Sequence, residues 1–399
     1  MENNKRGCTN SQFMSSSSQV EPDYEKTAAQ LPVIGVAVVG TGFGQKVHIP
    51  GFQAHPRTQV VAVYNRNLDQ AKAIADAHNI HHACNTIEDL VALPQVQAVS
   101  ISTPPFLHYE MAKTVLQAGK HLLLEKPTAL CAAEARELYQ LAQALGVIAT
   151  LDFEFRYVPA WQHLAELLSE GYVGQKRLIK IDWLVSSRAD ASRPWNWYSR
   201  SSQGGGALGA LGSHAFDYIS WLFGPVRRLG ARLSTAIPTR PDPATGEMKP
   251  VDADDTCMLM LELADGTPCQ VCISAAVHAP RPHWVEVYGD RGTLVLGSNN
   301  QKDYVHGFGV WANLAGQPQI EVEIPKRLAF SQTYTDGRIA PFIRVVDRWV
   351  QGIDQREAIA PSLREGVYSQ LLMDLTQTSH ESGRWVNVPE LETFLAGDL

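Results

Sequence analysis

The sequence has few cysteines, no long apolar run and no excess of positive charge. Six cysteines in 399 residues are too few for a disulfide scaffold and predict a reducing, cytoplasmic location. The longest apolar stretch, residues 33–44, is broken by glycines and is shorter than the roughly 18 residues that span a bilayer, so we expect no membrane partner. The chain carries 41 acidic and 34 basic residues, and its net charge of −7 argues against nucleic-acid binding.

The composition is otherwise that of an ordinary globular protein. Hydrophobic residues make up 45% of the chain and charged residues 19%, and the length favours two domains. Residues 1–32 are polar and serine-rich and lack the apolar core of a secretion signal. We expect this segment to be a disordered tail.

Two groups of cysteine and histidine residues could suggest a redox or metal site. Cys269 and Cys272 have C-x-x-C spacing, but they lie in a strand-like segment, where residues three apart point to opposite faces, whereas a redox pair needs a helix N-terminus. The histidine-rich segment 78–84 fits no usual zinc spacing, so a turn before a strand is the preferred interpretation. We expect no metal.

Strand-like and helix-like segments alternate in the first part of the chain. The expected strands are 33–39, 59–64, 98–102, 120–124 and 147–152, and the expected helical segments are 50–55, 68–78, 88–93, 108–118 and 132–145. This order is typical of an α/β fold with a doubly wound parallel sheet, a Rossmann fold. Its right-handed crossovers bring the carboxyl ends of the strands to one edge, where ligands bind.

The pattern changes after residue 152. We expect helices at 161–169, 341–351 and 363–381, and strands at 177–185, 255–263, 268–276, 284–288, 292–296 and 319–324. Short turns at 264–266 and 289–292 separate consecutive strands at hairpin distance, which indicates an open, mainly antiparallel sheet. The predicted organisation is a tail (1–32), a Rossmann domain (33–152) and an α+β domain for substrate binding and oligomerisation (153–390).

The first strand leads directly into a glycine-rich turn. This turn consists of Gly40, Thr41, Gly42, Phe43 and Gly44. Its glycines would let a pyrophosphate approach backbone N–H groups at a helix N-terminus. The turn departs from the G-x-G-x-x-G pattern at the third glycine: that position is Gln45, and Gly44 comes one place earlier. The context predicts dinucleotide binding, and a purely structural turn is the alternative.

The end of the second strand bears on which nicotinamide dinucleotide is bound. A carboxylate there would accept ribose hydroxyls and repel a 2′-phosphate, but this chain has Asn65 and Arg66. A neutral amide beside a cation favours NADP over NAD. The alternative is that Arg66 is an ordinary solvated arginine.

Three further motifs follow expected strand ends or open a helix. Thr103 and Pro104, with His108, follow one strand, and the Glu125-Lys126-Pro127 triplet follows the next. The proline restricts the backbone at this lysine and holds it in place. The third motif is the glycine-rich block 204–217, in which His214 lies one helical turn from Ala210 and from Asp217.

Taken together, these motifs resemble the Gfo/Idh/MocA oxidoreductases, the family of glucose-fructose oxidoreductase and inositol dehydrogenase, over residues 33–389. The resemblance implies that Lys126 lies beside the nicotinamide and the substrate hydroxyl, that Pro127 follows a cis peptide bond, and that His214 transfers the proton. The cofactor-binding residues that we expect are Gly40, Thr41, Gly42, Phe43, Gly44, Asn65, Arg66, Thr103, Pro104, His108, Glu125 and Lys126.

The chain departs from the family pattern at two positions. Four residues before the histidine, where the family has an aspartate that completes the Lys, Asp and His set, this chain has Ala210. The family's amide after the Rossmann core is replaced by Glu154. The sequence leaves open whether Glu154 supplies the missing charge.

The expected activity is hydride transfer between NAD(P) and a carbonyl or secondary alcohol of a sugar or polyol-like small molecule. The residues expected at the substrate are Arg156, Trp195, Trp197, His214 and Asp217. Loop packing is an equally good interpretation of the aromatic segment 193–198. The alternative function, based on Ala210, is a non-catalytic nicotinamide-binding sensor or assembly protein.

We also expect a homodimer or homotetramer. The open face of the second sheet would form the interface, as it commonly does in the family. The apolar residues assigned to that face are Val271, Ile273, Val285 and Val287.

Overall fold

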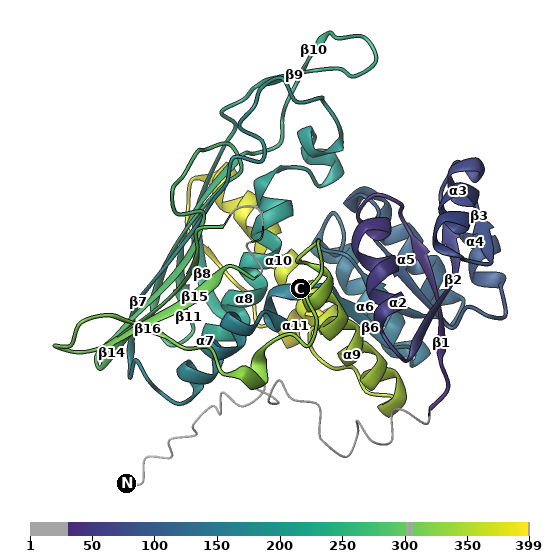
Figure 1. Cartoon of the computed structure of the whole chain (residues 1–399). Coiled ribbons are helices and arrows are strands. Elements are labelled where there is room, and N and C mark those ends of the chain that lie inside the picture. Colours follow the sequence, from purple (N-terminus) through teal and green to yellow (C-terminus); the bar gives the residue numbers. More distant parts are fainter. Residues whose placement is uncertain (1–30, 301–302, 304–305, 398–399) are drawn as a thin grey trace.

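The computed structural model describes residues 31–300, 303 and 306–397. Nearly all of the predicted tail lies outside the described residues. Two sheets face each other across a layer of helices, with the parallel sheet on the right of Figure 1 and a larger sheet on the left. Within the described part of the chain, no helix has the length and apolarity needed to cross a membrane.

The first sheet has six parallel strands in the order β3-β2-β1-β4-β5-β6. The strands are β1 (Ile34–Val39), β2 (Thr58–Tyr64), β3 (His82–Cys84), β4 (Ala98–Ile101), β5 (His121–Leu124) and β6 (Ala149–Leu151). The helices between them are α2 (Ile49–Ala54), α3 (Leu68–His78), α4 (Ile87–Ala92), α5 (His108–Gln117) and α6 (Ala132–Leu145). The predicted doubly wound sheet is confirmed. Every residue of β1 is buried, because helices cover both faces of the sheet.

One helix from the C-terminal part of the chain packs on this first sheet. Helix α9 (Ile339–Gln355) places Phe342, Val345 and Trp349 in the same core as β1 and α2. Their spacing predicts a helix with one apolar face but does not indicate which sheet that face covers. The core around the first sheet therefore includes residues from both sides of the predicted boundary at residue 152.

The second sheet has nine strands in the order β16-β15-β14-β13-β7-β12-β11-β8-β17. Its strands are β7 (Lys176–Leu184), β8 (Val226–Ser234), β11 (Thr256–Leu263), β12 (Pro268–Ser274), β13 (His283–Gly289), β14 (Gly292–Ser298), β15 (Phe308–Leu314), β16 (Ile320–Val322) and β17 (Val386–Asn387). Only the β7–β12 pair is parallel, so the predicted mainly antiparallel sheet is confirmed. The sequence analysis missed β8, β15 and the short β17. Charged and glycine residues interrupt the apolar pattern of β8, which contains Arg227, Arg228 and Gly230.

Helices cover one face of this second sheet. They are α7 (Pro159–Ser169), α8 (Ser213–Phe223) and α10 (Leu363–Ser382). Val271, Ile273, Val285 and Val287, which we assigned to the free face, are instead buried against these helices. That assignment was wrong because period-two alternation separates two faces of a strand without showing which one the helices cover.

The outer face carries the alternate residues of the same strands. Met258 and Met260 of β11 are 51% and 52% exposed. Trp284 of β13 and Trp311 of β15 stack on each other with ring centroids 5.2 Å apart. The C-x-x-C pair divides between the faces as predicted, with Cys269 buried and Cys272 partly exposed, and both are free thiols.

Candidate active site

The glycine turn after β1 packs against the end of β4 and leaves one side open. A Cβ on Gly40, which has φ of 101°, would lie 2.8 Å from Ser102, and a Cβ on Gly44 would collide with the Ser102 hydroxyl. Nothing lies within 4 Å of the Cβ position of Gly42. The chain then enters a π-helical turn, η2 (Gly44–His48).

This turn fits a dinucleotide pyrophosphate. Gly44 provides the close helix–strand approach that the third glycine of the G-x-G-x-x-G pattern provides elsewhere. A π-helical turn contains one residue more than an α-helical turn. Gly44 can therefore make this close approach although it lies one place earlier in the sequence than the third glycine of the pattern. The open side at Gly42, next to free backbone N–H groups, suits a phosphate.

The end of β2 lies next to the glycine turn. Asn65 donates a hydrogen bond from Nδ2 to Thr41 Oγ1 at 2.5 Å and accepts one from the Asn67 backbone at 2.8 Å. Arg66 is exposed. The structure therefore brings a neutral amide and an exposed cation to the place where the sequence analysis expected the adenosine ribose.

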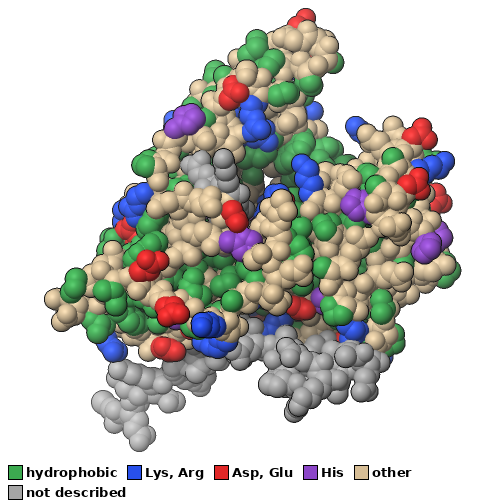
Figure 2. Space-filling view, in the orientation of Figure 1, with side chains coloured by type: hydrophobic (Ala, Val, Ile, Leu, Met, Phe, Trp, Pro, Cys, Tyr) green, Lys and Arg blue, Asp and Glu red, His purple; other side chains and the backbone are tan. Residues whose placement is uncertain are grey.

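Lys126 lies directly after β5 at the carboxyl edge of the parallel sheet. The backbone N–H of Glu125 continues the ladder to Ile101 O at 2.9 Å, and the Lys126–Pro127 peptide bond is cis, as the resemblance implied. Lys126 is partly exposed. Among the described residues, no hydrogen bond or ion pair occupies its Nζ. In Figure 2, a notch separates the part of the molecule formed by the parallel sheet from the part that carries the β9–β10 hairpin (Thr239–Pro241 and Met248–Pro250).

A buried histidine that the sequence analysis did not identify lies under Lys126. His48, at the end of η2, is 0% exposed and stacks on Phe342 of α9 with ring centroids 4.4 Å apart. Its Nδ1 lies 2.8 Å from Ser100 Oγ, and its Nε2 lies 3.1 Å from Glu125 Oε1 and 3.6 Å from Asp152 Oδ2. We call His48, Glu125, Asp152 and the nearby Glu154 the carboxylate cluster.

The protonation of this cluster follows from its contacts. Burial alone would lower the pKa of His48, but hydrogen bonds and charges from Asp152 and Glu125 outweigh burial and raise the pKa to about 9. Burial also opposes ionisation of Glu125, yet His48 and the charge of Lys126 lower its pKa to about 2. An imidazolium and an ionised Glu125 are therefore expected at neutral pH.

The other two carboxyl groups of the cluster are harder to ionise. Burial, followed by the charge of Glu125, raises the pKa of Asp152 to about 7. Burial and the charges of Asp152 and Glu125 raise the pKa of Glu154 well above its usual range. Glu154 is buried, and its Oε2 has no hydrogen-bond partner among the described residues. Burial therefore disfavours a negative charge on Glu154.

His214, at the start of α8, lies in apolar surroundings. It is 5% exposed, and its Nδ1 has no hydrogen-bond partner within the described chain. Its ring centroid lies 5.0 Å from that of Phe155, 6.0 Å from that of Phe153 and 6.1 Å from that of Trp183. Burial, followed by the positive charge of Lys126, lowers the pKa of His214 well below its usual value. The structure thus brings a neutral imidazole near the ammonium group of Lys126.

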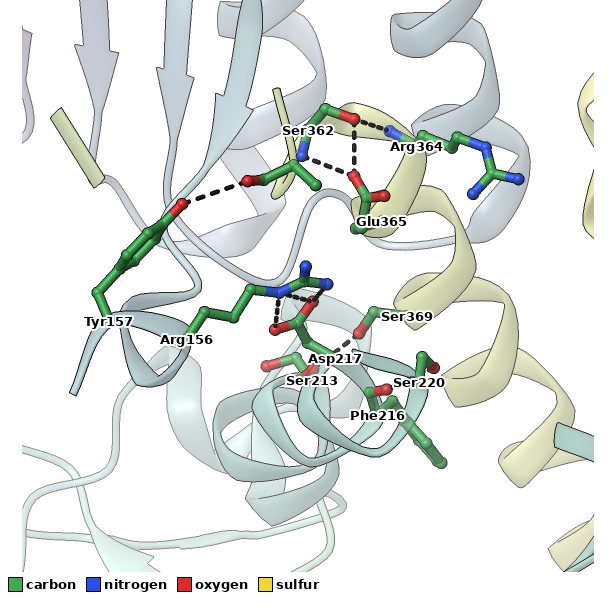
Figure 3. A network of polar contacts seen from close by, with 11 residues as sticks. Arg156, Tyr157, Ser213, Phe216, Asp217, Ser220, Ser362, Arg364, Glu365 and Ser369 are labelled. Atoms are coloured by element: carbon green, nitrogen blue, oxygen red, sulfur yellow. Dashed lines mark hydrogen bonds and ion pairs between the residues drawn. The ribbon is translucent and has the colours of Figure 1, made fainter. Parts of the chain in front are cut away.

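Arg156 and Asp217, predicted at the substrate, bind each other (Figure 3). The guanidinium donates to both carboxylate oxygens, at 2.7 Å from Nη2 and 2.9 Å from Nε, and the two side chains are only 11% and 1% exposed. The pair joins η4 (Glu154–Tyr157) to α8. It therefore fixes the helix that carries His214, and direct substrate contact by either residue stays a prediction.

His108 has a bracing position. It is buried, and its two ring nitrogens each lie 2.8 Å from a backbone carbonyl, that of Thr103 and that of Pro127. The ring ties the turn after β4 to the turn that carries Lys126. His108 therefore supports the two turns, and its contact with the cofactor stays a prediction. Glu125 is likewise held beneath Lys126 by His48.

The predicted substrate tryptophan Trp195 packs on the β9–β10 hairpin. Its Nε1 donates to Pro250 O at 2.9 Å, and its ring contacts the cations of Arg200 and Lys249, 5.5 and 5.0 Å from the ring centroid. The hairpin projects at the top of Figure 1. These contacts match the loop-packing alternative for Trp195, while Trp197 contacts the ring of Tyr198.

Comparisons with known proteins agree with this site. Residues 34–153 match the family model "Oxidoreductase family, NAD-binding Rossmann fold", and residues 165–388 match "Oxidoreductase family, C-terminal alpha/beta domain". An uncharacterized oxidoreductase of Synechocystis sp. is 55% identical over 366 residues, covering 92% of this chain and 99% of that protein. Levoglucosan dehydrogenase of Pseudarthrobacter phenanthrenivorans is 25% identical over 401 residues, covering 90% and 99%.

Solved structures show the same fold. Levoglucosan dehydrogenase in complex with NADH and L-sorbose superposes with a TM-score of 0.80 at 24% identity, covering 90% of this chain and 100% of that one. The two family models together cover the parallel sheet and the second sheet. The chain belongs to the Gfo/Idh/MocA family and is a nicotinamide-dependent oxidoreductase.

Proposed function

We propose that the protein transfers a hydride between a nicotinamide dinucleotide and a secondary alcohol or carbonyl carbon of a sugar-like small molecule. The observation that carries this proposal is that Lys126, at the carboxyl edge of the dinucleotide-binding sheet, lies close enough to His214 for its charge to help keep that imidazole neutral. Relatives named as dehydrogenases of levoglucosan and of D-xylose support the substrate class.

The glycine turn would hold the pyrophosphate, and the bound nicotinamide supplies the hydride acceptor or donor. Lys126 donates a hydrogen bond to the reacting oxygen and stabilises negative charge that develops there. His214 accepts the hydroxyl proton during alcohol oxidation and returns it during reduction. Phe153, Phe155 and Trp183 exclude water from the imidazole.

The non-catalytic alternative rested on the loss of the family aspartate at Ala210. It is not favoured, because Lys126 and His214 are both retained and the charge of Lys126 reaches His214 and lowers its pKa. A panel of sugars and polyols, assayed with NAD and with NADP by nicotinamide absorbance, tests the enzymatic proposal. Turnover with any of them that disappears in Lys126→Ala supports it, and no turnover in a preparation that binds the dinucleotide contradicts it.

We further propose that NADP is preferred over NAD. Support comes from the neutral Asn65, which is tied to the glycine turn, and from the exposed Arg66. A 2′-phosphate would meet no carboxylate from either residue and would find one cation.

We infer that two copies of the chain associate through the outer face of the second sheet. Half-exposed Met258 and Met260, together with the stacked pair Trp284 and Trp311, give this face apolar area to bury. The double variant Met258→Lys/Met260→Lys should shift the solution mass toward the monomer. Met248→Lys, at a 57% exposed methionine on the hairpin, is the matched control. A strictly monomeric wild type at micromolar concentration contradicts the inference.

A further inference from the structure

A cavity of about 380 Å³ lies behind the segments that carry Lys126 and His214. It lies between α10, the end of β8 and the loop 201–209, and its lining includes neither Lys126 nor His214. Its volume falls within the range of small-molecule sites, about 300 to 1,000 Å³. The proposed oxidoreductase function uses no residue of this cavity.

The charged groups that line this cavity are acidic. They are Asp252, Asp254, Asp374 and Glu381; His380 also lines the cavity, and no lysine or arginine does. Backbone N–H groups hold three of the carboxylates in place: Ser201 N donates to Asp252 at 2.7 Å, Leu208 N to Asp254 at 2.9 Å and Ala132 N to Asp374 at 2.7 Å. Burial raises the pKa of Asp254 to about 7 and raises that of Asp374 above its usual range, so a bound cation would favour the ionised form of both.

A buried side-chain amide in the cavity wall also lacks a hydrogen-bond donor for its oxygen. Gln370 lines the cavity, is only 4% exposed and donates from Nε2 to Asp374 Oδ1 at 3.2 Å. Its Oε1 is buried and has no partner among the described residues. Because buried acceptors are normally satisfied, an occupant that donates hydrogen bonds would complete this side chain.

The remaining lining combines polar side chains (Ser201, Ser234, Thr235, Gln377 and His380) with an apolar part. The apolar part includes Pro127, Leu130, Leu208, Leu233 and Met373. Methylene groups fit such surfaces, whereas a hydrated inorganic cation gains nothing from them. The lining therefore favours an organic cation with an alkyl body.

We propose that this cavity binds an aliphatic polyamine, with its ammonium groups at the carboxylates and Gln370 and its methylene chain along Leu208, Leu233 and Met373. The occupant would contact both Pro127, next to Lys126, and the glycine loop that leads to His214. Binding should therefore stabilise the fold against heat.

Calorimetric titration of the full-length protein with spermidine at physiological salt tests this proposal. We expect saturable binding at one site per chain and a higher unfolding temperature, and 1,4-butanediol, which lacks charge, should do neither. Binding of butanediol with similar affinity, or no saturable heat with millimolar spermidine, overturns the proposal.

Variants separate this cavity from general attraction to an acidic protein. Asp252→Asn keeps an oxygen to accept from Ser201, and Glu381 is exposed, so the double variant Asp252→Asn/Glu381→Gln should fold normally. We expect it to weaken spermidine binding about fivefold, and Gln370→Glu to strengthen it. Glu357→Gln, at an exposed carboxylate outside the cavity, is the control. An equal effect of Glu357→Gln and of the double variant would show non-specific charge attraction and overturn the proposal.

Discussion

Two buried histidines lie near Lys126, and they are opposite in charge. His48 contacts Glu125 and Asp152, which raise its pKa to about 9, whereas His214 is surrounded by aromatic rings and its pKa is lowered. Both rings are at least nine-tenths buried, so burial alone does not decide their charge. What differs is the presence of carboxyl groups within hydrogen-bond distance.

This difference between His48 and His214 reflects the location of the carboxyl groups in the site. Ala210 stands where the family has an aspartate four residues before the histidine, and the buried carboxyl groups near Lys126 belong instead to the carboxylate cluster. His214 is thus expected to be uncharged at pH 7, and Lys126 lies close enough to Glu125 for its charge to lower the pKa of that carboxyl group. The central claim is that His48 is charged and His214 neutral at pH 7.

Removing the charged ring should have the largest effect. We expect His48→Gln to lower the free energy of unfolding by about 3 kcal/mol, because two buried carboxyl groups lose their cationic partner. Chemical denaturation measures this. His55→Gln is the matched control, because its partner Asp347 is 43% exposed at 3.0 Å and the loss should stay below about 1 kcal/mol. Equal losses in the two variants would contradict a charged His48.

The same comparison predicts a pH dependence of stability. The pKa of His48 is raised from 6.5 to about 9 in the folded state, so its contribution to stability is complete below pH 6.5 and is lost as the pH rises through 9. Asp152, with its pKa raised to about 7, acts in the same direction. We expect the unfolding free energy of the wild type to fall by on the order of 2 kcal/mol over this range. The fall should be smaller in His48→Gln.

Lys126→Ala should reduce turnover on the order of a hundredfold or more, because the developing charge on the substrate oxygen loses its only proposed cation. Cofactor affinity should change much less. Steady-state kinetics and dinucleotide titration measure the two effects, and Lys72→Ala, at an exposed lysine on α3, is the control. His214→Ala should slow the reaction less than Lys126→Ala. Unchanged turnover in Lys126→Ala would refute the mechanism.

Ala210→Asp should reduce the difference in pKa between His48 and His214. A carboxylate one helical turn before His214 would stabilise its imidazolium and raise its pKa, so activity should rise by roughly tenfold or the pH optimum should shift. The pH profile of kcat/KM measures this change. Ala210→Asn has nearly the same shape without the charge and should leave the profile unchanged. A response to Asn as large as the response to Asp would exclude an electrostatic cause.

The smallest predicted effect concerns the cofactor. Arg66→Ala should weaken NADP binding roughly fivefold and leave NAD binding unchanged, because only NADP has the 2′-phosphate. Fluorescence titration with both dinucleotides measures this. If both affinities fell equally, the proposed phosphate contact would be wrong.

Local patterns in the sequence predicted much of the fold and part of the site. Buried β-branched runs indicated β1 and its parallel neighbours, and the motifs around Lys126 and His214 identified the central pair. His48 was missed because its partners come from distant segments: Glu125 is 77 residues away, and Ser100 is 52 residues away. The sequence offered one indication of a role for His48: it is a histidine on the buried side of the first helical turn after the glycines.

Properties that depend on which surfaces meet could not be predicted. The apolar face of α9 was visible in the sequence, but its packing against the first sheet was not, since a helix face does not specify its partner. The correct strand alternation in β12 and β13 likewise left the covered face undetermined. Both depend on long-range packing, which local periodicity does not encode.

The most direct test of the central claim is an NMR titration of the histidine ring nitrogens, with resonances assigned by His48→Gln and His214→Gln. The account predicts a doubly protonated His48 at pH 7 that loses its proton near pH 9, and a His214 that stays neutral down to well below pH 6.5. A neutral His48 together with a protonated His214 at pH 7 would contradict it.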